Sequence, residues 1–342
     1  MKRKLSVLLL LVFVLSMLSA CGNSNKPADS SSDIEPIQLI MGHCDAEDEN
    51  DPYHQSCIAF AAAVERLSGG LVTVTVYPNA QLGDERSVVE AIQNGSVDCS
   101  TVTNAVTSNF QPITKILDYP FMFESVEQAR EVTGSAAAQK ILDSMSEVGI
   151  KGLAFTENGF RFILNNKRPI KTASDLSGLK LRVMQSPVYM DFYSRVNCGA
   201  SPLPFGEVYT AVSQGTVDGY DLPLPVVLSS KLYEISKYMT DIRYTYTSLM
   251  IIMNEEKFNS YPEQVQQWLM EAAQEARTKC FAKNDEVLAN GLAQLEGQVE
   301  ITPFEEVDFA GFQEVSKPVW ENQTESDAAK AILNDILAIT SK

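Results

Sequence analysis

The chain has 342 residues, of which 45% are hydrophobic and 21% are charged, and its formal net charge is −17. A chain of this length can form two α/β domains with separate cores. The acidic excess excludes nucleic acid and anionic lipid surfaces as expected partners, because both would repel the protein. With only His43 and His54 and no Cys-X-X-Cys pair, the sequence also predicts no metal site.

The first 20 residues predict a bacterial lipoprotein signal peptide. They combine a basic start, an apolar core and the small residues of "LSAC", which is similar to the motif whose cysteine is acylated after cleavage. Cys21 is therefore the expected lipidation site, and an ordinary signal peptide or an uncleaved anchor helix is the alternative. Residues 21–33 are small and polar, as in a flexible tether. The expected location is outside the cytoplasm, with a lipid anchor in the cell membrane.

The first third of the folded chain predicts strands that alternate with helices. Periodicity of two predicts strands over 36–44, 71–77 and 96–103, and periodicity of 3.6 predicts helices over 57–67 and 83–95. The strand over 71–77 is the clearest, because valine and threonine alternate along it. This order is typical of parallel sheets whose two faces are covered by helices.

The middle and last thirds continue the pattern. A long helix is expected over 125–148, followed by two short strands within 150–166 that are separated by Asn158 and Gly159. A strongly apolar strand is expected over 248–254. The final long helix is expected over 262–290, with Pro262 near its first turn.

A short strand after Gly178 carries an arginine in an apolar setting. Leu179, Leu181 and Val183 alternate as on a buried face, and Arg182 lies among them. An unpaired charge in such a strand is costly. Arg182 therefore pairs with a protein carboxylate, such as Asp218 or Asp221, or it binds a ligand.

Five cysteines follow Cys21, and an odd number leaves at least one thiol unpaired if every disulfide is intramolecular. Cys44 and Cys57 are near enough in sequence to bridge a loop. Buried free thiols are an equally good interpretation.

Four stretches in order, "YPNAQLGDERSVVEAIQNGSVD", "NGFRFILNNKRPIKTASDLSGLKLRV", "GASPLPFGEVYTAVSQGTVDGYDLP" and "SKLYEISKYMT", resemble the substrate-binding proteins of tripartite ATP-independent periplasmic (TRAP) transporters, of the C4-dicarboxylate and sialic-acid binding type. The resemblance covers about 37–329. It implies two α/β domains of the periplasmic-binding-protein-like fold (class II type), a long helix spanning both, and a ligand cleft between them. Domain I would comprise 34–159 and 248–287, and domain II would comprise 160–247 and 288–342.

The resemblance also implies ligand-binding residues. Arg182, in "LRV", matches the arginine that binds the ligand carboxylate through two hydrogen bonds, a geometry that a planar guanidinium favours. Arg161, in "NGFRF", matches a second arginine. Phe205 and Glu85 match an aromatic platform and an acidic contact. Core or hinge packing of Phe205 and a helix-dipole role for Glu85 are equally open.

The chain departs from the family at "DGYDLP", where relatives often carry an asparagine that holds the ligand and this chain carries Leu222. Tyr220 and Asp221 are the candidate replacements. An acid in the cleft favours a hydroxylated monocarboxylate, such as a sugar acid, over a dicarboxylate, unless Asp221 neutralises an arginine instead. His43 and Cys44, at the end of the first strand, are further candidates because loops of that edge would face the cleft.

The expected function is that of an extracytoplasmic receptor that binds a small organic acid and delivers it to a TRAP membrane permease. It needs no cofactor, and a monomer is expected. The alternative is an extracytoplasmic hydrolase or lyase that uses cleft carboxylates. The scarcity of histidine and the absence of a G-X-S-X-G motif and of a metal-ligand cluster argue against that alternative.

Overall fold

The computed structural model describes residues 34–340, and one compact unit begins at Pro36. The expected signal peptide, Cys21 and the whole of the expected tether precede this range and lie outside the described residues. Within 34–340, no helix has the length and apolar character needed to cross a membrane.

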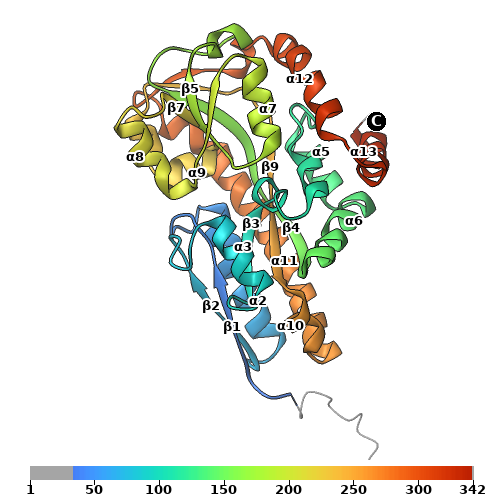
Figure 1. Cartoon of the computed structure of the whole chain (residues 1–342). Coiled ribbons are helices and arrows are strands. Elements are labelled where there is room, and N and C mark those ends of the chain that lie inside the picture. The colour runs from blue at the N-terminus through green and yellow to red at the C-terminus, as the bar shows by residue number, and fades with distance from the viewer. Residues whose placement is uncertain (1–33, 341–342) are drawn as a thin grey trace, which may run out of the picture. The chain divides into compact units, whose positions relative to one another are not determined.

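The first lobe is built on parallel strands at one end of a ten-stranded sheet (Figure 1). Strand β1 lies between β2 and β3 and pairs in parallel with both. Helices α2 and α3 follow β1 and β2 and supply the crossovers that parallel pairing requires. These elements and the neighbouring α4 and η2 are β1 (Ile37–Gly42), α2 (Pro52–Leu67), β2 (Val72–Tyr77), α3 (Glu85–Gln93), β3 (Cys99–Thr103), α4 (Asn104–Thr107) and η2 (Pro112–Asp118).

The second lobe forms the other end of the sheet. Strand β5 lies between β6 and β7 and pairs in parallel with both, and β8 pairs with β10. The elements are η4 (Ala173–Leu176), β5 (Lys180–Val183), α7 (Pro187–Arg195), β6 (Gly199–Pro202), η5 (Phe205–Glu207), α8 (Val208–Ser213), β7 (Gly219–Pro223), α9 (Leu224–Ser229), η6 (Leu232–Ile235), β8 (Tyr238–Thr240), β10 (Glu300–Thr302) and η7 (Phe304–Glu306).

One long strand, β4 (Ile150–Asn165), runs through both lobes. Its first part pairs with β9 (Tyr246–Asn254), and its last part pairs with β7 and β8. The prediction of two short strands is wrong here. The register shifts between Glu157 and Gly159, where Gly159 has a φ of 105°, so Asn158 and Gly159 form an irregularity within the strand instead of a turn.

The longest helix, α11 (Glu263–Gln294), also contacts both lobes. It packs against α2 and β4, and its later residues pack against α9 of the second lobe. Small side chains permit this close packing, since Ala272, Ala273 and Ala276 are buried and a Cβ atom on Gly291 would approach Leu224 of α9. The expected long helix is confirmed, with Pro262 at its N-cap.

The helix expected over 125–148 is broken in the structure. It is divided into α5 (Val126–Thr133), α6 (Ala136–Ser144) and the 3-10 helix η3 (Met145–Val148). Gly134 ends α5, and the Ser135 side chain accepts a hydrogen bond from the Ala138 amide to begin α6. A serine cap directly after a glycine therefore ends one helix and begins another.

The last helix departs from the expected division into domains. Helix α12 (Phe309–Gln323) packs against α7, but α13 (Asp327–Thr340) packs against α5 and α6. Gln128 Nε2 donates to the Thr340 carbonyl at 2.9 Å. The chain end thus returns to the helices that follow the first lobe, and 288–342 do not all belong to the second. Helix α10 (Glu255–Ser260) completes the described elements.

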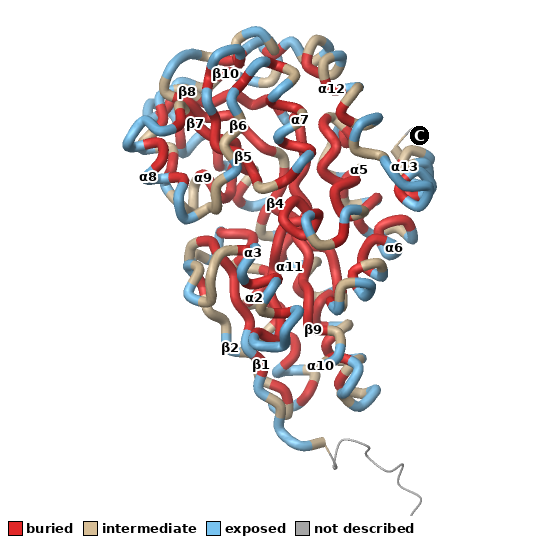
Figure 2. The backbone as a smooth tube through the Cα atoms, viewed as in Figure 1, coloured by how far each residue is buried: buried red, intermediate tan, exposed pale blue. Residues whose placement is uncertain are grey.

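Buried residues fill the central strands β3, β7 and β9 and most of β4, whereas the edge strands β2 and β6 are mostly intermediate or exposed (Figure 2). One apolar cluster joins α3, α5 and α6 to β5 and α7, and a second cluster fills the space between β7, α8 and α9. The sheet is therefore covered on both faces, as the alternating pattern of strands and helices predicted.

Candidate ligand-binding site

A small cavity lies between the two lobes, at the carboxyl ends of β1 and β5. The first lobe supplies Cys44, Asp84, Glu85 and Val106, and the second lobe supplies Arg182, Met184, Gln185, Leu203, Pro204 and Phe205. The cavity has a volume of about 10 Å³, which is room for about one water molecule. Crevices at the carboxyl ends of parallel strands are the usual ligand sites of such sheets. At this volume, the cavity is too small for an organic acid in this conformation.

Arg182 is the one arginine that lines this cavity. Its side chain is 2% exposed, and its Nε donates to the Leu203 carbonyl at 2.8 Å. Its Nη1 has no hydrogen-bond partner among residues 34–340, and no carboxylate of that range forms an ion pair with it. Burial, followed by the nearby charge of Arg161, lowers the pKa of Arg182. An anion in the cavity would provide the missing partner.

Arg161, in β4, is fully committed within the protein. It is 1% exposed, and its Nε and Nη2 each lie 3.1 Å from a carboxylate oxygen of Asp221, which is 0% exposed. Its Nη1 donates to Thr247 Oγ1 at 3.2 Å, and its guanidinium lies over the Tyr189 ring. Burial alone would lower the pKa of Arg161, but Asp221 raises it overall.

The two alternatives for Arg182 and Asp221 are thereby resolved in the described structure. Asp221 neutralises Arg161, as one of the two interpretations held. Asp218 accepts from the Lys180 amide and pairs with Lys167. Neither acid reaches Arg182, which leaves one free positive charge at the cavity and not two.

Glu85 lies at the start of α3 and in the wall of the cavity. It lies in the first turn of α3, beside the capping residue Asp84. Its Oε1 accepts from the Thr103 amide at 2.7 Å and from the Tyr53 hydroxyl at 3.2 Å. Burial raises the pKa of Glu85. The residue therefore fixes the start of α4 and also lines the cavity.

Phe205 closes the cavity from the second lobe. It begins the 3-10 helix η5 after Pro204 and packs against a small cluster of the first lobe that contains Cys44, Tyr53 and Leu249. Its ring is thus both a wall of the cavity and an apolar contact between the lobes.

His43 does not line this cavity, contrary to the expectation. It is buried, and its Nε2 lies 3.1 Å from Nδ1 of His54 on α2. Burial and the neighbouring His54 lower the pKa of His43 to about 3, so the ring stays neutral. Cys44, the other candidate at the strand end, does line the cavity.

Tyr220 and Leu222 lie on the other face of β7 from Asp221. Both are buried in the apolar cluster of the second lobe, and the Tyr220 hydroxyl lies 2.9 Å from Ser236 Oγ. Tyr220 therefore does not replace the family's asparagine at the cavity, and the structure corrects that expectation. Leu222 takes part in the packing of the core.

The question of a disulfide between Cys44 and Cys57 is answered by their hydrogen bonds. Cys57 Sγ donates to Thr101 Oγ1 at 3.4 Å, and Cys44 Sγ donates to Asp45 Oδ1 at 3.3 Å. All five cysteines of the described range are buried free thiols. The second interpretation of these residues is the one observed.

Several buried polar atoms near the seam between the lobes lack partners within 34–340, and the sequence analysis did not anticipate their residues. The most notable is Asp118, whose two carboxylate oxygens are both unpaired and whose burial raises its pKa to about 8. No local sequence pattern distinguishes these residues, because each lies in an irregular segment or among core side chains. The others are Asn104, Asn158, Tyr189 and Ser248.

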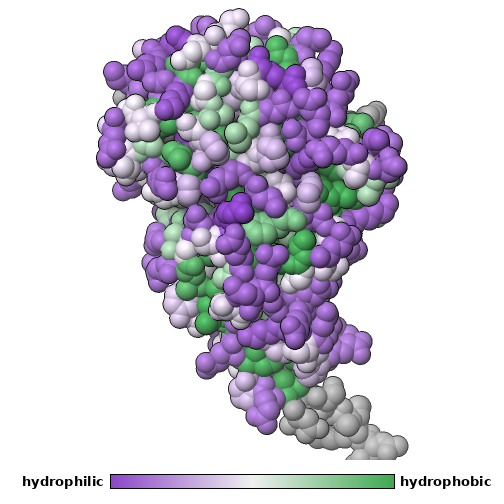
Figure 3. Space-filling view, in the orientation of Figure 1, coloured by the Kyte–Doolittle hydropathy of each residue, from purple (hydrophilic) through white to green (hydrophobic). Residues whose placement is uncertain are grey.

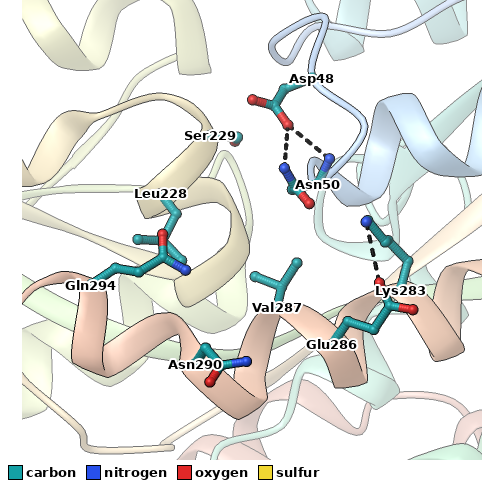
Figure 4. A pocket seen from close by; sticks show the side chains of 9 residues that line it. All are labelled: Asp48, Asn50, Leu228, Ser229, Lys283, Glu286, Val287, Asn290 and Gln294. Atoms are coloured by element: carbon teal, nitrogen blue, oxygen red, sulfur yellow. Dashed lines mark hydrogen bonds and ion pairs between the residues drawn. The ribbon is translucent and has the colours of Figure 1, made fainter.

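A larger pocket lies elsewhere, between the loop that precedes α2, the end of α9 and α11 (Figure 4). Its charged groups have hydrogen-bond or ion-pair partners within the pocket. Asp48 Oδ1 accepts from the Asn50 amide and side chain at 2.8 and 3.0 Å, and Lys283 lies 3.3 Å from Glu286. This pocket therefore offers no unpaired charge like that of Arg182.

The face drawn in Figure 3 is largely hydrophilic.

The fold and the cavity define a two-lobed solute-binding protein with a periplasmic-binding-protein-like architecture. The chain belongs to the family described as bacterial extracellular solute-binding protein, family 7, whose model matches residues 43–327. The resemblance to TRAP solute-binding proteins is confirmed, and the family consists of binding proteins of transporters and not of enzymes. The family is extracytoplasmic.

Three similar proteins illustrate the relationship. A solute-binding protein of Verminephrobacter eiseniae is 38% identical over 81% of this chain and 82% of its own. The C4-dicarboxylate-binding periplasmic protein DctP of Rhodobacter capsulatus is 29% identical, with coverage of 87% and 90%. The crystal structure of a TRAP periplasmic solute-binding protein from Polaromonas bound to D-erythronate has a TM-score of 0.85, 32% identity and coverage of 90% and 100%.

Proposed function

We propose that this protein is a receptor for a small hydroxylated monocarboxylate, such as a sugar acid. The observation that carries the proposal is the buried guanidinium of Arg182, which lines the cavity without a carboxylate partner among residues 34–340. Because Asp221 already neutralises Arg161, the site has one positive charge to offer. One guanidinium matches one carboxylate through two parallel hydrogen bonds.

The surroundings of Arg182 argue against a second carboxylate on the ligand. Glu85 lines the same cavity, and Asp45 is a nearby buried acid that contributes to the electrostatics of Cys44 and Tyr53. Burial raises the pKa of both Asp45 and Glu85. A dicarboxylate would have to bury its second charge beside these two acids with no second free cation to pair with it. Hydroxyl groups can instead donate to buried oxygen atoms. The relative that binds D-erythronate supports this class, and the dicarboxylate-binding relative represents the competing one.

We further propose that the two lobes act as domains that separate to admit the ligand. The first would comprise 34–159 and 248–287, and the second would comprise 160–247 and 288–326, with α13 returned to the first. The strands β4 and β9 and the helix α11 connect the lobes and would act as the hinge. Hinge closure around a ligand is a common motion of two-domain binding proteins.

For the cellular setting, we propose a lipid anchor on Cys21, a tether formed by 21–33 and delivery of the ligand by a monomer to a TRAP membrane permease. The support is the signal-like sequence before Cys21 and membership of the family. A receptor of this kind needs affinity and closure and no catalytic nucleophile.

Thermal unfolding with a panel of acids tests the proposal. The panel contains sugar acids, keto acids, dicarboxylates and amino acids, and binding to the native state raises the melting temperature. Calorimetry then measures the affinity for the best acid in wild type, Arg182→Lys, Arg182→Ala and Arg66→Lys. We expect both Arg182 variants to lose binding while remaining folded, because lysine cannot form two parallel bonds. Arg66 is an exposed control that pairs with Glu275. Unchanged affinity in both Arg182 variants contradicts the proposal.

A further inference from the structure

Asp118 is a buried acid whose side chain has no partner within 34–340. It ends the 3-10 helix η2 and is 0% exposed, and neither of its carboxylate oxygens accepts or donates a hydrogen bond in that range. Its backbone carbonyl accepts a hydrogen bond from Thr245 Oγ1 at 2.6 Å. Buried polar groups without partners are rare in native proteins, and each requires an explanation.

Two neighbours of Asp118 have unused hydrogen-bonding capacity as well. Asn104, at the start of α4, and Tyr189, in α7, lie close enough to favour the charged form of Asp118, but neither forms a well-aligned hydrogen bond with it. Asn104 Oδ1 and the Tyr189 hydroxyl remain unpaired within the described chain. Asn104 and Asp118 belong to the first lobe and Tyr189 to the second, so the three side chains meet at the seam that opens when the lobes separate.

This group of three residues lies near the Arg182 cavity. Arg161 and Glu85 each exert an electrostatic effect on both Asp118 and Arg182. The Thr103 amide that bonds Glu85 directly precedes Asn104. Tyr189 follows the strand that carries Arg182 by one short turn. The Arg161 guanidinium also lies over the Tyr189 ring, 5.3 Å from its centroid. Asn104, Asp118 and Tyr189 do not line the closed cavity itself, so a ligand held by Arg182 would meet them where the lobes separate.

The charge state of Asp118 decides which ligand group it accepts. Arg161 is close, but its guanidinium is bonded to Asp221, and burial raises the pKa of Asp118 to about 8. At neutral pH the group is therefore mainly a neutral carboxyl, which donates one hydrogen bond and accepts others. Such a group pairs well with a hydroxyl, which also does both.

We infer that Asp118, together with Asn104 and Tyr189, forms a second subsite that binds a hydroxyl group of the ligand whose carboxylate is held by Arg182. The inference rests on the proposed function and adds specificity-determining residues to it. It assigns the ligand to hydroxy acids whose hydroxyl lies away from the carboxylate. A site built to bond a hydroxyl rejects the analogue that lacks it, because its own polar groups are then left unpaired.

The test compares ligands that differ by one hydroxyl. D-erythronate and its 2-deoxy, 3-deoxy and 4-deoxy analogues, with butyrate and succinate, are titrated by calorimetry into wild type, Asp118→Asn and Asp118→Leu. We expect wild type to lose at least tenfold in affinity for one deoxy analogue. Asp118→Leu is expected to bind erythronate and that analogue equally, and Asp118→Asn is expected to keep most of the discrimination because an amide also donates and accepts.

Controls separate this inference from the proposed function. Asp98→Asn changes a buried acid that precedes β3 and pairs with Lys257, and it is expected to leave the discrimination unchanged. If Asp118→Leu does not fold, Tyr189→Phe and Asn104→Ala provide the same comparison. If Asp118→Leu loses the same factor of affinity for erythronate and for every deoxy analogue, the hydroxyl subsite is overturned while the receptor function stands. The same holds if wild type binds butyrate or succinate more tightly than erythronate. If none of the acids binds wild type, the proposed ligand class fails and the subsite fails with it.

Discussion

Replacing Arg182 with methionine is expected to stabilise the ligand-free protein while it abolishes binding. Arg182 is 2% exposed, has one unpaired nitrogen and forms no ion pair within residues 34–340. Removal of an uncompensated buried charge raises the free energy of unfolding by several kcal/mol, and loss of the bond to the Leu203 carbonyl lowers it by about 1 kcal/mol. The expected net gain is about 1 to 3 kcal/mol. For a chain of this size, each kcal/mol shifts the melting temperature by about 2 °C.

The assay is calorimetric unfolding at neutral pH, without ligand and with the best acid from the panel. Arg182→Met is expected to melt about 2 to 6 °C above wild type without ligand and to show no further rise with it. Arg161→Met is the matched comparison and is expected to have the opposite sign. It leaves Asp221 buried and unpaired, which costs about 3 to 5 kcal/mol. If Arg182→Met is destabilised as strongly as Arg161→Met, the guanidinium has a protein partner and the reasoning is refuted.

Three further outcomes are expected. Because burial raises the pKa of Asp118 to about 8, the folded state keeps a proton that the unfolded state releases, so this group lowers stability by about 1.4 kcal/mol per pH unit as pH rises from 5 to 7. The free energy of unfolding, measured with urea at each pH, should therefore fall less steeply with pH in Asp118→Asn than in wild type, by about 1.4 kcal/mol per pH unit. The same pH dependence in both proteins contradicts the raised pKa of Asp118. Phe205→Ala is expected to speed ligand dissociation about tenfold in stopped-flow measurements, since it removes a contact that holds the lobes closed. Unaltered dissociation would place Phe205 outside the closing contact. Burial raises the pKa of the five thiols of the described range, which are Cys44, Cys57, Cys99, Cys198 and Cys280. These thiols should react with a thiol reagent only in denaturant. Rapid reaction in the native protein would contradict their burial.

Regular strands and long helices could be predicted from the sequence because their periodicity follows directly from side-chain geometry. The strand that carries Arg182 is an example, since Leu181 and Val183 are buried as expected and Lys180 is exposed. The irregular part of β4 could not be predicted. An asparagine followed by glycine usually marks a turn, and only the pairing of β4 with β9 and β7 keeps the chain extended through Gly159.

Site residues could be predicted from the sequence where the residue type alone determines the chemistry. They were missed where their role depends on which residues lie beside them in three dimensions. Arg182 was found because a guanidinium is conspicuous in an apolar strand. His43 and Cys44 were both candidates, because the sequence does not show which side chain faces the cleft beyond the end of a strand, and Cys44 is the one that lines the cavity. Asp118 was missed because its significance lies in having no partner, a property that becomes visible only when Asn104 and Tyr189 are placed beside it.

The position of β9 in the sheet has a consequence for how the protein is made. Strand β9 lies between β3 and β4, so the sheet of the first lobe remains incomplete until residues 246–254 have been synthesised. Helix α13 must then return from the chain end to cover α5 and α6. A truncated or nascent chain therefore cannot complete its first lobe, and such long-range pairing slows folding. A first lobe that cannot be completed until residue 254 has been made favours passage of the chain through a membrane before that lobe folds.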